Sequence, residues 1–254
     1  MDKIVKNKRD EIAHAKNSCP IEILREIVEP ATRDFREALR NGRSENLPKL
    51  IAELKRKSPS KATIRQNLEV GKVVDIYNKF ATAISVLTDI KFFGGSLEDL
   101  GEANETSNLP ILRKDFIVDE YQLLEARQFG ADAVLLIARI LKIEEIEKLI
   151  AEAKKIGLDC LVEIHDEADL KKVLQTSAEI IGINNRNLDS LEIDLNTTFE
   201  LIEKIPAEKI IVSESGICTR EDLEKLSGKV DAILIGSAIL QAEDVESKLI
   251  ELVG

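Results

Sequence analysis

Charged and hydrogen-bonding side chains interrupt or directly follow several short apolar segments of this sequence. An ion buried in an apolar interior loses much of its hydration, so such residues are expected to be paired or functional. For any single residue, a structural salt bridge explains the position as well as a catalytic role does. The stronger argument is their convergence, and the residues are Glu53, Lys55, Lys114, Glu163, Asn184, Arg186, Glu214 and Ser215.

Three carboxylates, two lysines and an arginine that meet in one place would suit a substrate with negative charge and a carbonyl group. An ammonium group can donate a proton to a carbonyl oxygen as negative charge develops there. A carboxylate can accept a proton or stabilise a positive charge. These residue types therefore predict general acid and base catalysis on a small anionic molecule.

Small residues follow the last two apolar segments and predict a phosphate site. They form the pairs Ser215-Gly216 and Gly236-Ser237. Glycine lets the backbone approach a ligand closely, and free N–H groups at the start of a helix favour an anion. Either pair alone is more often only a turn, but two of them after consecutive strands favour phosphate binding.

The elements that would position these residues are eight short apolar segments separated by helical patterns. Segments that are apolar almost throughout are typical of strands buried on both faces, as in parallel sheets. Between them, residues 143–153 carry apolar side chains at helical spacing, and residues 96–99 and 219–222 resemble capping boxes. The predicted strands are 50–54, 83–88, 110–114, 133–138, 160–164, 180–184, 210–214 and 232–236.

Eight alternating strand and helix units predict an α/β fold, a closed (β/α)8 TIM barrel. An open doubly wound sheet shares this alternation, but no GxGxxG motif follows an early strand. Residues 131–138 resemble residues 230–237, as a half-barrel duplication would produce, although short apolar strands also match by chance. In a barrel the carboxyl ends of the strands share one mouth, where the polar residues should meet.

The chain has 254 residues with 44% hydrophobic content and is expected to form a single barrel domain, 1–254. Residues 1–47 contain helical patterns broken at Pro20 and Pro30, which predicts an N-terminal helical extension. Such an extension could cover one end of the barrel.

Charge and composition argue against several classes of function. The formal net charge is −11, so binding to nucleic acid is not expected. No apolar run reaches about 18 residues and the first residues lack the apolar core of a signal peptide, so we expect a cytoplasmic protein without membrane attachment. Cys19, Cys160 and Cys218 are widely spaced, which favours reduced thiols over disulfides or a metal site.

The two histidines are weak candidates. His165 follows Glu163 by two residues, and the strand period puts both side chains on one face only if the strand continues that far. His165 is as easily the first residue of a loop. His14 lies in the polar extension and is expected to be solvated.

Seven segments of the sequence closely resemble the indole-3-glycerol-phosphate synthase family of tryptophan biosynthesis. They occur in the family's order across nearly all of the predicted barrel, which makes the resemblance highly specific. The segments are IAELKRKSPSK (51–61), ISVLTDIKFFGGSLEDL (84–100), ILRKDFIVDEYQLLEARQFGADAVLLIARIL (111–141), LVEIHDEADL (161–170), IIGINNRNLDSLEIDLNTT (180–198), IVSESGI (211–217) and AILIGSAIL (232–240).

The resemblance implies a carbon-carbon lyase of amino-acid biosynthesis that needs neither cofactor nor metal. A chain with these segments would close 1-(2-carboxyphenylamino)-1-deoxy-D-ribulose 5-phosphate to indole-3-glycerol phosphate, with loss of carbon dioxide and water. By position, the family's active-site residues are Glu53, Lys55, Lys114, Glu163, Asn184 and Ser215, and its phosphate contacts are Ser58, Gly216, Gly236 and Ser237. The other substrate-binding residues that we predict are Phe93, Phe116, Leu135, Arg186 and Glu214.

Within the implied reaction, Lys114 is the predicted acid at the substrate's carbonyl oxygen. Glu163 and Lys55 together are the predicted acid–base pair of the dehydration, with neither role assigned to one of them, and Glu53 would stabilise positive charge on the anilino nitrogen. Either lysine could serve either step.

The sequence departs from the family at a few positions. It has no Trp and two Tyr, so contact with the anthranilate ring should fall to Phe93 and Phe116. Asp89 stands where the family more often has glutamate, a difference expected to matter little away from the reacting groups. The resemblance leaves contact with other tryptophan-pathway enzymes open.

Three alternatives remain at this stage. Another phosphate-binding barrel such as a phosphoribosylanthranilate isomerase would also use an acid and a base at the carboxyl ends, but its signatures are absent. A Schiff-base aldolase could use Lys114 or Lys55 as nucleophile. A non-catalytic barrel that only binds phosphorylated ligands is disfavoured by the acid, base and phosphate residues together. Fold alone does not separate these functions.

Overall fold

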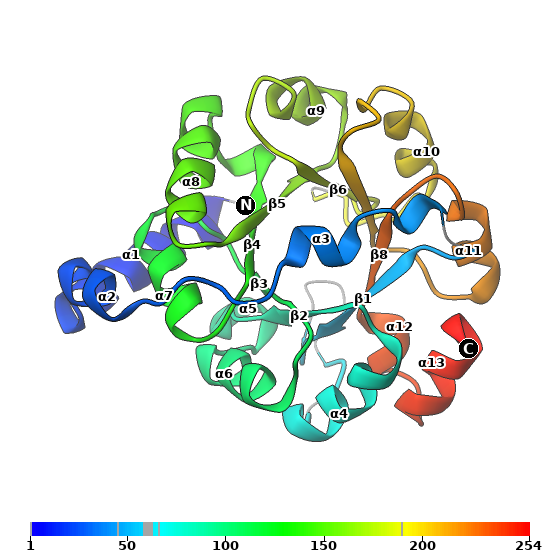
Figure 1. Ribbon diagram of the computed structural model, residues 1–254, viewed down its shortest axis with the longest axis horizontal. Coiled ribbons are helices and arrows are strands. Elements are labelled where there is room, and N and C mark those ends of the chain that lie inside the picture. Colours follow the sequence, from blue (N-terminus) through cyan, green and yellow to red (C-terminus); the bar gives the residue numbers. More distant parts are fainter. Residues whose placement is uncertain (1, 45, 58–62, 66, 189) are drawn as a thin grey trace.

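The computed structural model is a closed barrel of eight parallel strands in sequence order, with β8 beside β1 (Figure 1). It describes residues 2–44, 46–57, 63–65, 67–188 and 190–254. The strands are β1 (Lys49–Leu54), β2 (Ala83–Leu87), β3 (Ile111–Lys114), β4 (Ala133–Ile137), β5 (Asp159–Ile164), β6 (Ile180–Asn184), β7 (Ile210–Glu214) and β8 (Ala232–Ile235). The predicted TIM barrel is confirmed, and the doubly wound sheet is excluded.

Each strand lies at a predicted apolar segment, and its ends agree with the prediction to within one residue. The strand interiors are buried on both faces, which is why their sequences are apolar almost throughout. The barrel closes where Lys49 lies opposite Ala232 and Ala52 lies opposite Ile235. All eight carboxyl ends consequently open at one mouth.

Helices surround the barrel and connect each strand to the next (Figure 1). Ser96 accepts a hydrogen bond from the backbone of Asp99, and Thr219 and Asp222 form a reciprocal capping box, so both predicted helix starts are present. These elements are α4 (Val70–Phe80), α5 (Ile90–Phe93), α6 (Leu97–Thr106), α7 (Tyr121–Gln128), η2 (Ala138–Ile140), α8 (Ile143–Lys155), α9 (Glu167–Val173), α10 (Asn196–Ile202), α11 (Arg220–Leu226), α12 (Ser237–Leu240) and α13 (Val245–Val253).

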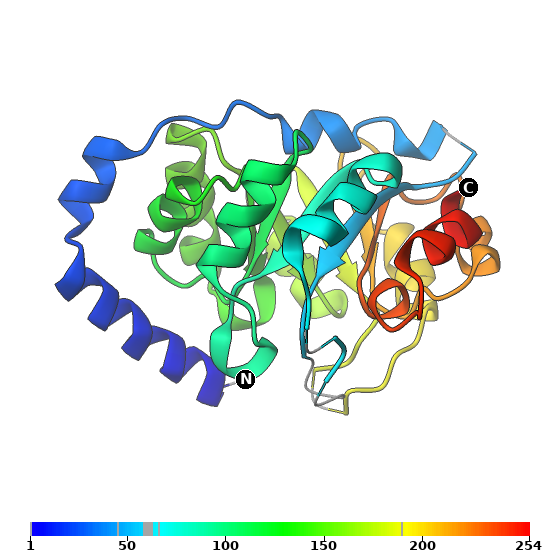
Figure 2. The same ribbon diagram turned by 90° about the horizontal axis from the view of Figure 1, so that it is seen from below.

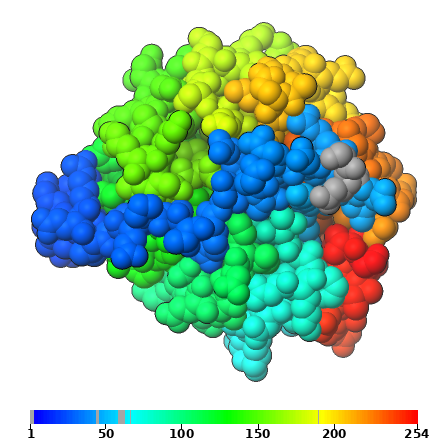
Figure 3. All heavy atoms as spheres, in the orientation of Figure 1, coloured from blue at the N-terminus to red at the C-terminus, as the bar shows by residue number. Residues whose placement is uncertain are grey.

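An N-terminal extension precedes β1 and runs from one end of the barrel to the other (Figure 2). It contains α1 (Asp2–Ser18), α2 (Ile21–Ile27), α3 (Phe35–Leu39) and the short turn η1 (Gly42–Ser44). Helix α3 crosses the amino-terminal end of the barrel, where the space-filling view shows the extension lying over the surface (Figure 3). Helix α1 reaches toward the mouth. None of the described helices is long and apolar enough to cross a membrane.

Apolar side chains fill two layers on either side of the barrel wall. Inside, Leu112, Leu161 and Val212 form one cluster with Phe35 and Leu39 of α3, which therefore closes the amino-terminal end. Outside, the alternate strand residues pack against the surrounding helices in a second cluster. A third, smaller cluster joins α1 and α2 to α7. The extension is thus anchored by burial both at the closed end and along the side of the barrel.

Two buried aspartates fasten the amino-terminal ends of β4 and β8 in the same way. Asp132 accepts a backbone N–H of β3 at 2.9 Å and pairs with Arg33 at 2.7 Å. Asp231 accepts a backbone N–H of β7 at 2.8 Å and pairs with Arg43 at 3.0 Å. The two aspartates occupy matching positions in the two segments whose sequences resemble each other. The similarity between the two segments therefore has a structural counterpart: the same aspartate contact joins β4 to β3 in the first half of the barrel and β8 to β7 in the second half.

Candidate active site

Lys114, the last residue of β3, lies at the carboxyl mouth among three carboxylates. Its Nζ pairs with Oε2 of Glu214 at the end of β7. The same atom lies 3.5 Å from Glu163 on β5 and 4.0 Å from Glu53 on β1. All three carboxylates are almost fully buried. Four predicted residues that are far apart in the sequence therefore meet, and we call Lys114, Glu53, Glu163 and Glu214 the Lys114 cluster.

Two glycines make room for carboxylates of the Lys114 cluster. A Cβ atom at Gly182 of β6 would lie 2.4 Å from Oε1 of Glu214, and one at Gly236 would lie 2.4 Å from Oε1 of Glu53. Contacts this short are not tolerated in a packed interior, so a side chain at either position would displace a carboxylate. Gly236 is a predicted site residue, whereas Gly182 is not. An isolated glycine inside a strand pattern is the signal that could have identified it.

Burial and mutual charge give the members of the cluster different proton affinities. Burial works against the Lys114 ammonium, but the surrounding carboxylates outweigh it and hold the pKa of Lys114 above its usual range. Burial raises the pKa of Glu214 to about 7, with Lys114 opposing this shift and the charge of Glu163 adding to it. Glu163 is also buried, yet Lys114 and His165 hold its pKa below the usual range. Near neutral pH the cluster thus offers a charged ammonium, an ionised carboxylate and a carboxyl group that exchanges its proton.

His165 directly follows β5 and contacts the cluster, although the strand ends at Ile164. Its Nε2 lies 3.2 Å from Glu163 and its Nδ1 lies 3.6 Å from Asp169. Burial opposes the imidazolium, but these two carboxylates raise the pKa of His165 to about 9. His165 is therefore the first residue of the loop after β5, which was one of its two predicted positions. It also forms an ion pair with Glu163. In the sequence, the separation of two residues between Glu163 and His165 was the signal that their side chains lie on the same face.

Lys55 and Asn184 lie beside the cluster. Lys55 follows β1, and its Nζ lies 2.5 Å from Oε1 of Glu53. The two predicted lysines therefore share Glu53. Asn184 ends β6 and helps to lower the pKa of Glu163, and its Oδ1 accepts the backbone N–H of Arg186 at 3.0 Å. The guanidinium of Arg186 donates to a backbone carbonyl of its own loop at 3.1 Å.

The predicted apolar contacts of the substrate lie together. Phe93 ends α5 and Phe116 follows β3, and their ring centroids are 6.1 Å apart with an interplanar angle of 40°. Both rings pack against the apolar interior of the barrel, to which Leu135 of β4 also belongs. Phe116 is two residues after Lys114, so the end of β3 and the loop after it contribute to both the charged cluster and the apolar contacts.

The predicted phosphate contacts lie on two neighbouring loops. Strands β7 and β8 pair directly, so Ser215-Gly216 and Gly236-Ser237 follow adjacent strand ends. Ser215 and Gly216 both have positive φ, 67° and 83°. A Cβ at Gly216 would lie 2.5 Å from a side chain of the loop after β6, so this turn needs glycine. Ser237 begins α12. Ser58 lies outside the described residues.

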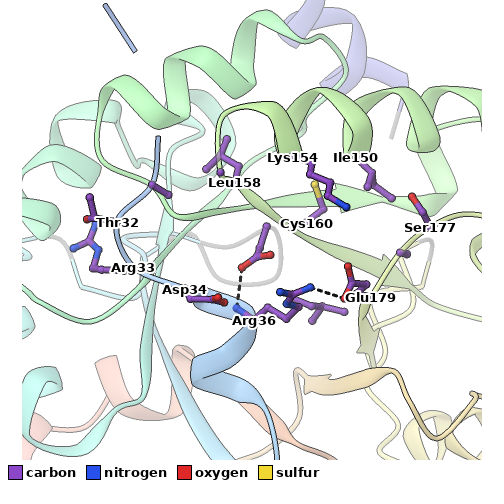
Figure 4. A pocket seen from close by; sticks show the side chains of 15 residues that line it. Thr32, Arg33, Asp34, Arg36, Ile150, Lys154, Leu158, Cys160, Ser177 and Glu179 are labelled. Atoms are coloured by element: carbon purple, nitrogen blue, oxygen red, sulfur yellow. Dashed lines mark hydrogen bonds and ion pairs between the residues drawn. The ribbon is translucent and has the colours of Figure 1, made fainter. Parts of the chain in front are cut away.

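A separate cavity of about 390 Å³ lies at the amino-terminal ends of β5 and β6, between α3 and α8 (Figure 4). Three of its charged residues contact one another: Arg36 contacts Glu179 at 2.6 Å, and its backbone N–H donates to Asp159 at 2.8 Å. The described residues that line it include none of the predicted site residues. This cavity lies at the opposite end from the Lys114 cluster.

The carboxylates of the Lys114 cluster are contacted by Lys114, Lys55 and His165. Within the described ranges, no group of three or more His, Cys, Asp or Glu residues is arranged to hold a metal ion. The Lys114 ammonium instead lies between the carboxylates. The arrangement can therefore protonate an oxygen and take up a proton with its own residues.

The chain matches the model of the family described as indole-3-glycerol phosphate synthase over residues 1–252. The indole-3-glycerol phosphate synthase of Polaromonas naphthalenivorans is 43% identical, over 100% of this chain and 98% of that protein. The one of Burkholderia vietnamiensis is 42% identical, over 96% of this chain and 95% of that protein. Among solved structures, 3-hexulose-6-phosphate synthase from Salmonella typhimurium has a TM-score of 0.65 at 17% identity, over 80% of this chain and 96% of that one. The last likeness concerns the fold alone.

Proposed function

Because the chain belongs to the indole-3-glycerol phosphate synthase family, we propose that the Lys114 cluster carries out that family's reaction. The chain is a carboxy-lyase of tryptophan biosynthesis. It closes 1-(2-carboxyphenylamino)-1-deoxy-D-ribulose 5-phosphate to indole-3-glycerol phosphate and releases carbon dioxide and water. The observation that most supports our placement of the reaction is the Lys114 ammonium among three buried carboxylates at the barrel mouth.

Lys114 is the proposed acid of the ring-closing step. The benzene carbon that bears the carboxylate attacks the ketone carbon, and the ketone oxygen takes up a proton to become a hydroxyl. Since carboxylates surround it, the Lys114 ammonium is charged when the substrate arrives. It stabilises negative charge on the oxygen and supplies the proton. Carbon dioxide then leaves from the same benzene carbon, which restores the aromatic ring.

Glu163 and Lys55 are the proposed base and acid of the dehydration. The departing hydroxyl needs a proton, and the neighbouring carbon must lose one. Glu163 is held in its ionised form by Lys114 and His165, and Lys55 is the second ammonium group at the mouth. Glu53 lies within ion-pair distance of both lysines, so its carboxylate is suited to stabilise positive charge on the anilino nitrogen.

The two ends of the substrate are proposed to bind on either side of the cluster. Phe93, Phe116 and Leu135 supply apolar surface for the anthranilate ring. The loops after β7 and β8 supply backbone N–H groups for the phosphate, at the start of α12. Asn184 and Ser215 would orient the groups between them, and Arg186 and Ser58 remain predicted contacts.

Two expectations about the cell remain predictions. One is a cytoplasmic location, and the other is contact with other tryptophan-pathway enzymes. Fractionation of the cell and copurification under mild salt would test them.

Turnover of the carboxyphenylamino-deoxyribulose phosphate, followed by indole fluorescence, tests the proposed site. The chain contains no Trp, so the protein does not mask the product's emission. Lys114→Met removes the ammonium and keeps an unbranched side chain, and we expect kcat to fall by roughly 10³-fold or more. Lys142→Met is the matched control, because Lys142 is an exposed lysine after β4 at the same end of the barrel. Its turnover should equal that of the wild type.

The same assay has two outcomes that would contradict the proposal. Turnover of Lys114→Met within tenfold of the wild type would refute the role of Lys114. Loss of wild-type turnover on addition of a chelator would contradict the expectation that no metal takes part. An equal loss in Lys142→Met would show that any lost charge at the mouth has the same effect.

A further inference from the structure

Lys8 of α1 is buried at the carboxyl end of the barrel, which the N-terminal helix approaches (Figure 2). Its Nζ lies 3.0 Å from Oδ1 of Asp115 and 3.2 Å from Oδ2 of Asp89. Glu11 on the next turn of α1 contacts the same ammonium at 2.7 Å. A lysine of the extension thus bridges two carboxylates that follow β2 and β3.

Each of the two aspartates orients the backbone beside an aromatic residue. Asp89 is fully buried and caps α5, because its Oδ1 accepts the N–H of Phe92 at 2.7 Å. Asp115 is also buried, and its Oδ1 accepts the N–H of Phe116 at 2.8 Å. Both carboxylates are therefore part of the loops that end these strands, and neither can move without its loop.

The two loops joined in this way carry the two rings of the apolar wall. Phe93 ends the helix that Asp89 caps, and Phe116 directly follows Asp115. The two rings contact each other in a tilted arrangement, with 6.1 Å between their centroids. A change in the spacing of the two aspartates would therefore change the spacing of the rings.

Lys8 supplies charge that this pair of aspartates needs. Burial opposes ionisation of Asp115, and Arg113 together with Lys8 overcomes it and holds the pKa of Asp115 below its usual range. Oδ2 of Asp89 has no hydrogen-bond donor in the described part of the chain, and the Lys8 ammonium is its ion-pair partner. Without Lys8, Asp115 keeps Arg113 and the hydrogen bond from Thr88, but Asp89 loses its ion-pair partner. The two like charges then repel more strongly in a medium of low dielectric, which favours a wider spacing of the loops.

We propose that Lys8 is a positioning residue of the active site: by bridging Asp89 and Asp115 it sets the spacing of the loops that carry Phe93 and Phe116. The fit of the substrate's aromatic end then depends on a residue of the N-terminal extension. This inference rests on the proposed function, which makes the two rings a substrate contact. Lys8 acts through the two aspartates and touches no reacting atom.

Steady-state kinetics of Lys8 variants tests the inference. Lys8→Met removes the charge, and we expect KM for the substrate to rise about tenfold while kcat changes less than about threefold. Lys8→Arg keeps the charge, and its KM should remain within about threefold of the wild type. Lys16→Met is the matched control, because Lys16 lies on the same helix and pairs with Asp119 at 2.8 Å without bridging two carboxylates.

A KM of Lys8→Met close to that of the wild type, or an equal rise in Lys16→Met, would overturn the inference. All assays are run below the lowest melting temperature of the set, so loss of folded protein does not imitate a change in KM. Should Lys8→Met fail to fold, Lys8→Gln, which keeps a hydrogen-bond donor, is judged by the same criteria.

The position of the rings can be followed without turnover. The chain contains seven Phe, and fluorine NMR of the fluorophenylalanine-labelled protein gives a signal for each. Phe93→Leu and Phe116→Leu assign the two signals of interest. Lys8→Met should shift these two, and unchanged signals would contradict the inference. Absence of indole product from the wild type would instead contradict the proposed function, so the two failures are distinguishable.

Discussion

At the amino-terminal end of the barrel, Asp132 and Asp231 each have an arginine and a backbone N–H as partners. At the carboxyl end, Lys114 lies among three carboxylates, and Oε1 of Glu214 has no hydrogen-bond donor among the described residues. In the first arrangement each carboxylate has both a cation and a backbone donor. The second leaves polar groups for a substrate to satisfy. Buried charge therefore holds the barrel together at one end and, in our proposal, carries out the chemistry at the other.

The sharpest way to test this comparison is Glu214→Gln, which should lower activity without lowering stability. Glu214 contacts Lys114 directly, so we expect kcat to fall on the order of 10³-fold. Burial raises the pKa of Glu214 to about 7, so its ionised form is disfavoured in the folded protein, and neutral Gln should not destabilise it above that pH. Product fluorescence and thermal melting at pH about 8 measure the two effects. A variant that melts well below the wild type would contradict the comparison.

Arg33→Met, at the amino-terminal end, should lower the stability of the protein without lowering its activity. It leaves the buried carboxylate of Asp132 without its closest cation, so the free energy of unfolding should fall by about 3 kcal/mol. The kcat and KM of the folded protein should stay within about twofold of the wild type, since the Lys114 cluster is at the other end. Urea unfolding and steady-state kinetics provide the measurements. A large loss of kcat with unchanged stability would mean that the two ends are not separate in function.

Gly182→Ala should affect both properties moderately. Its Cβ would lie 2.4 Å from Oε1 of Glu214, so the carboxylate must leave its present position beside Lys114. We expect kcat/KM to fall about tenfold and the free energy of unfolding to fall by about 1–2 kcal/mol. Gly101→Ala in α6 is the control, because its Cβ would meet nothing closer than 3.7 Å. That variant should keep full activity, and a wild-type rate for Gly182→Ala would show that the close approach is unimportant.

The smallest expected effect is a pH dependence of stability from His165. Burial lowers the pKa of His165, but the carboxylates of Asp169 and Glu163 outweigh it. The net effect raises the pKa of His165 from the ordinary 6.5 to about 9. The stability contributed by a raised pKa is complete below the unfolded pKa and is lost as pH rises through the folded one. The unfolding free energy of the wild type relative to His165→Gln should therefore decrease by about 1 kcal/mol or more between about pH 6 and pH 9.5.

Urea unfolding across that pH range measures the His165 effect. His14→Gln is the control, because His14 is the chain's other histidine and is exposed on α1. A fall of the size expected for His165→Gln should not appear with His14→Gln, because the His14 ring contacts a backbone carbonyl and not two carboxylates. A flat difference for His165→Gln as well would mean that the imidazole does not gain a proton on folding.

The strands could be predicted from the sequence because burial on both faces leaves continuous apolar segments. The breaks at Pro20 and Pro30 likewise located the ends of the first two helices. The path of the extension could not be predicted, since an amphipathic helix does not say which surface it covers. That α3 closes the amino-terminal end while α1 reaches the mouth depends on packing against distant parts of the chain.

The members of the candidate site could be named because charges stand out at the ends of apolar strands. Their contacts could not, because spacing along the chain does not give distances in space. Lys55, for example, was paired with Glu163 in the predicted mechanism, and in the structure it contacts Glu53. Asp89 was expected to matter little, yet it is buried and ion-paired with Lys8. Glu53 lies two residues before Lys55 at the end of the same strand, whereas the partner of Asp89 is supplied by the N-terminal extension.

The seam between β1 and β8 has a consequence for synthesis on the ribosome. These strands pair with each other, and Arg43 before β1 reaches Asp231 before β8 at 3.0 Å. As the nascent chain emerges, β1 appears first among the strands and its outer edge has no partner until β8 follows. An open strand edge readily pairs with other chains. The growing polypeptide must therefore keep this edge protected, and chaperone binding is expected to matter most before β8 leaves the exit tunnel.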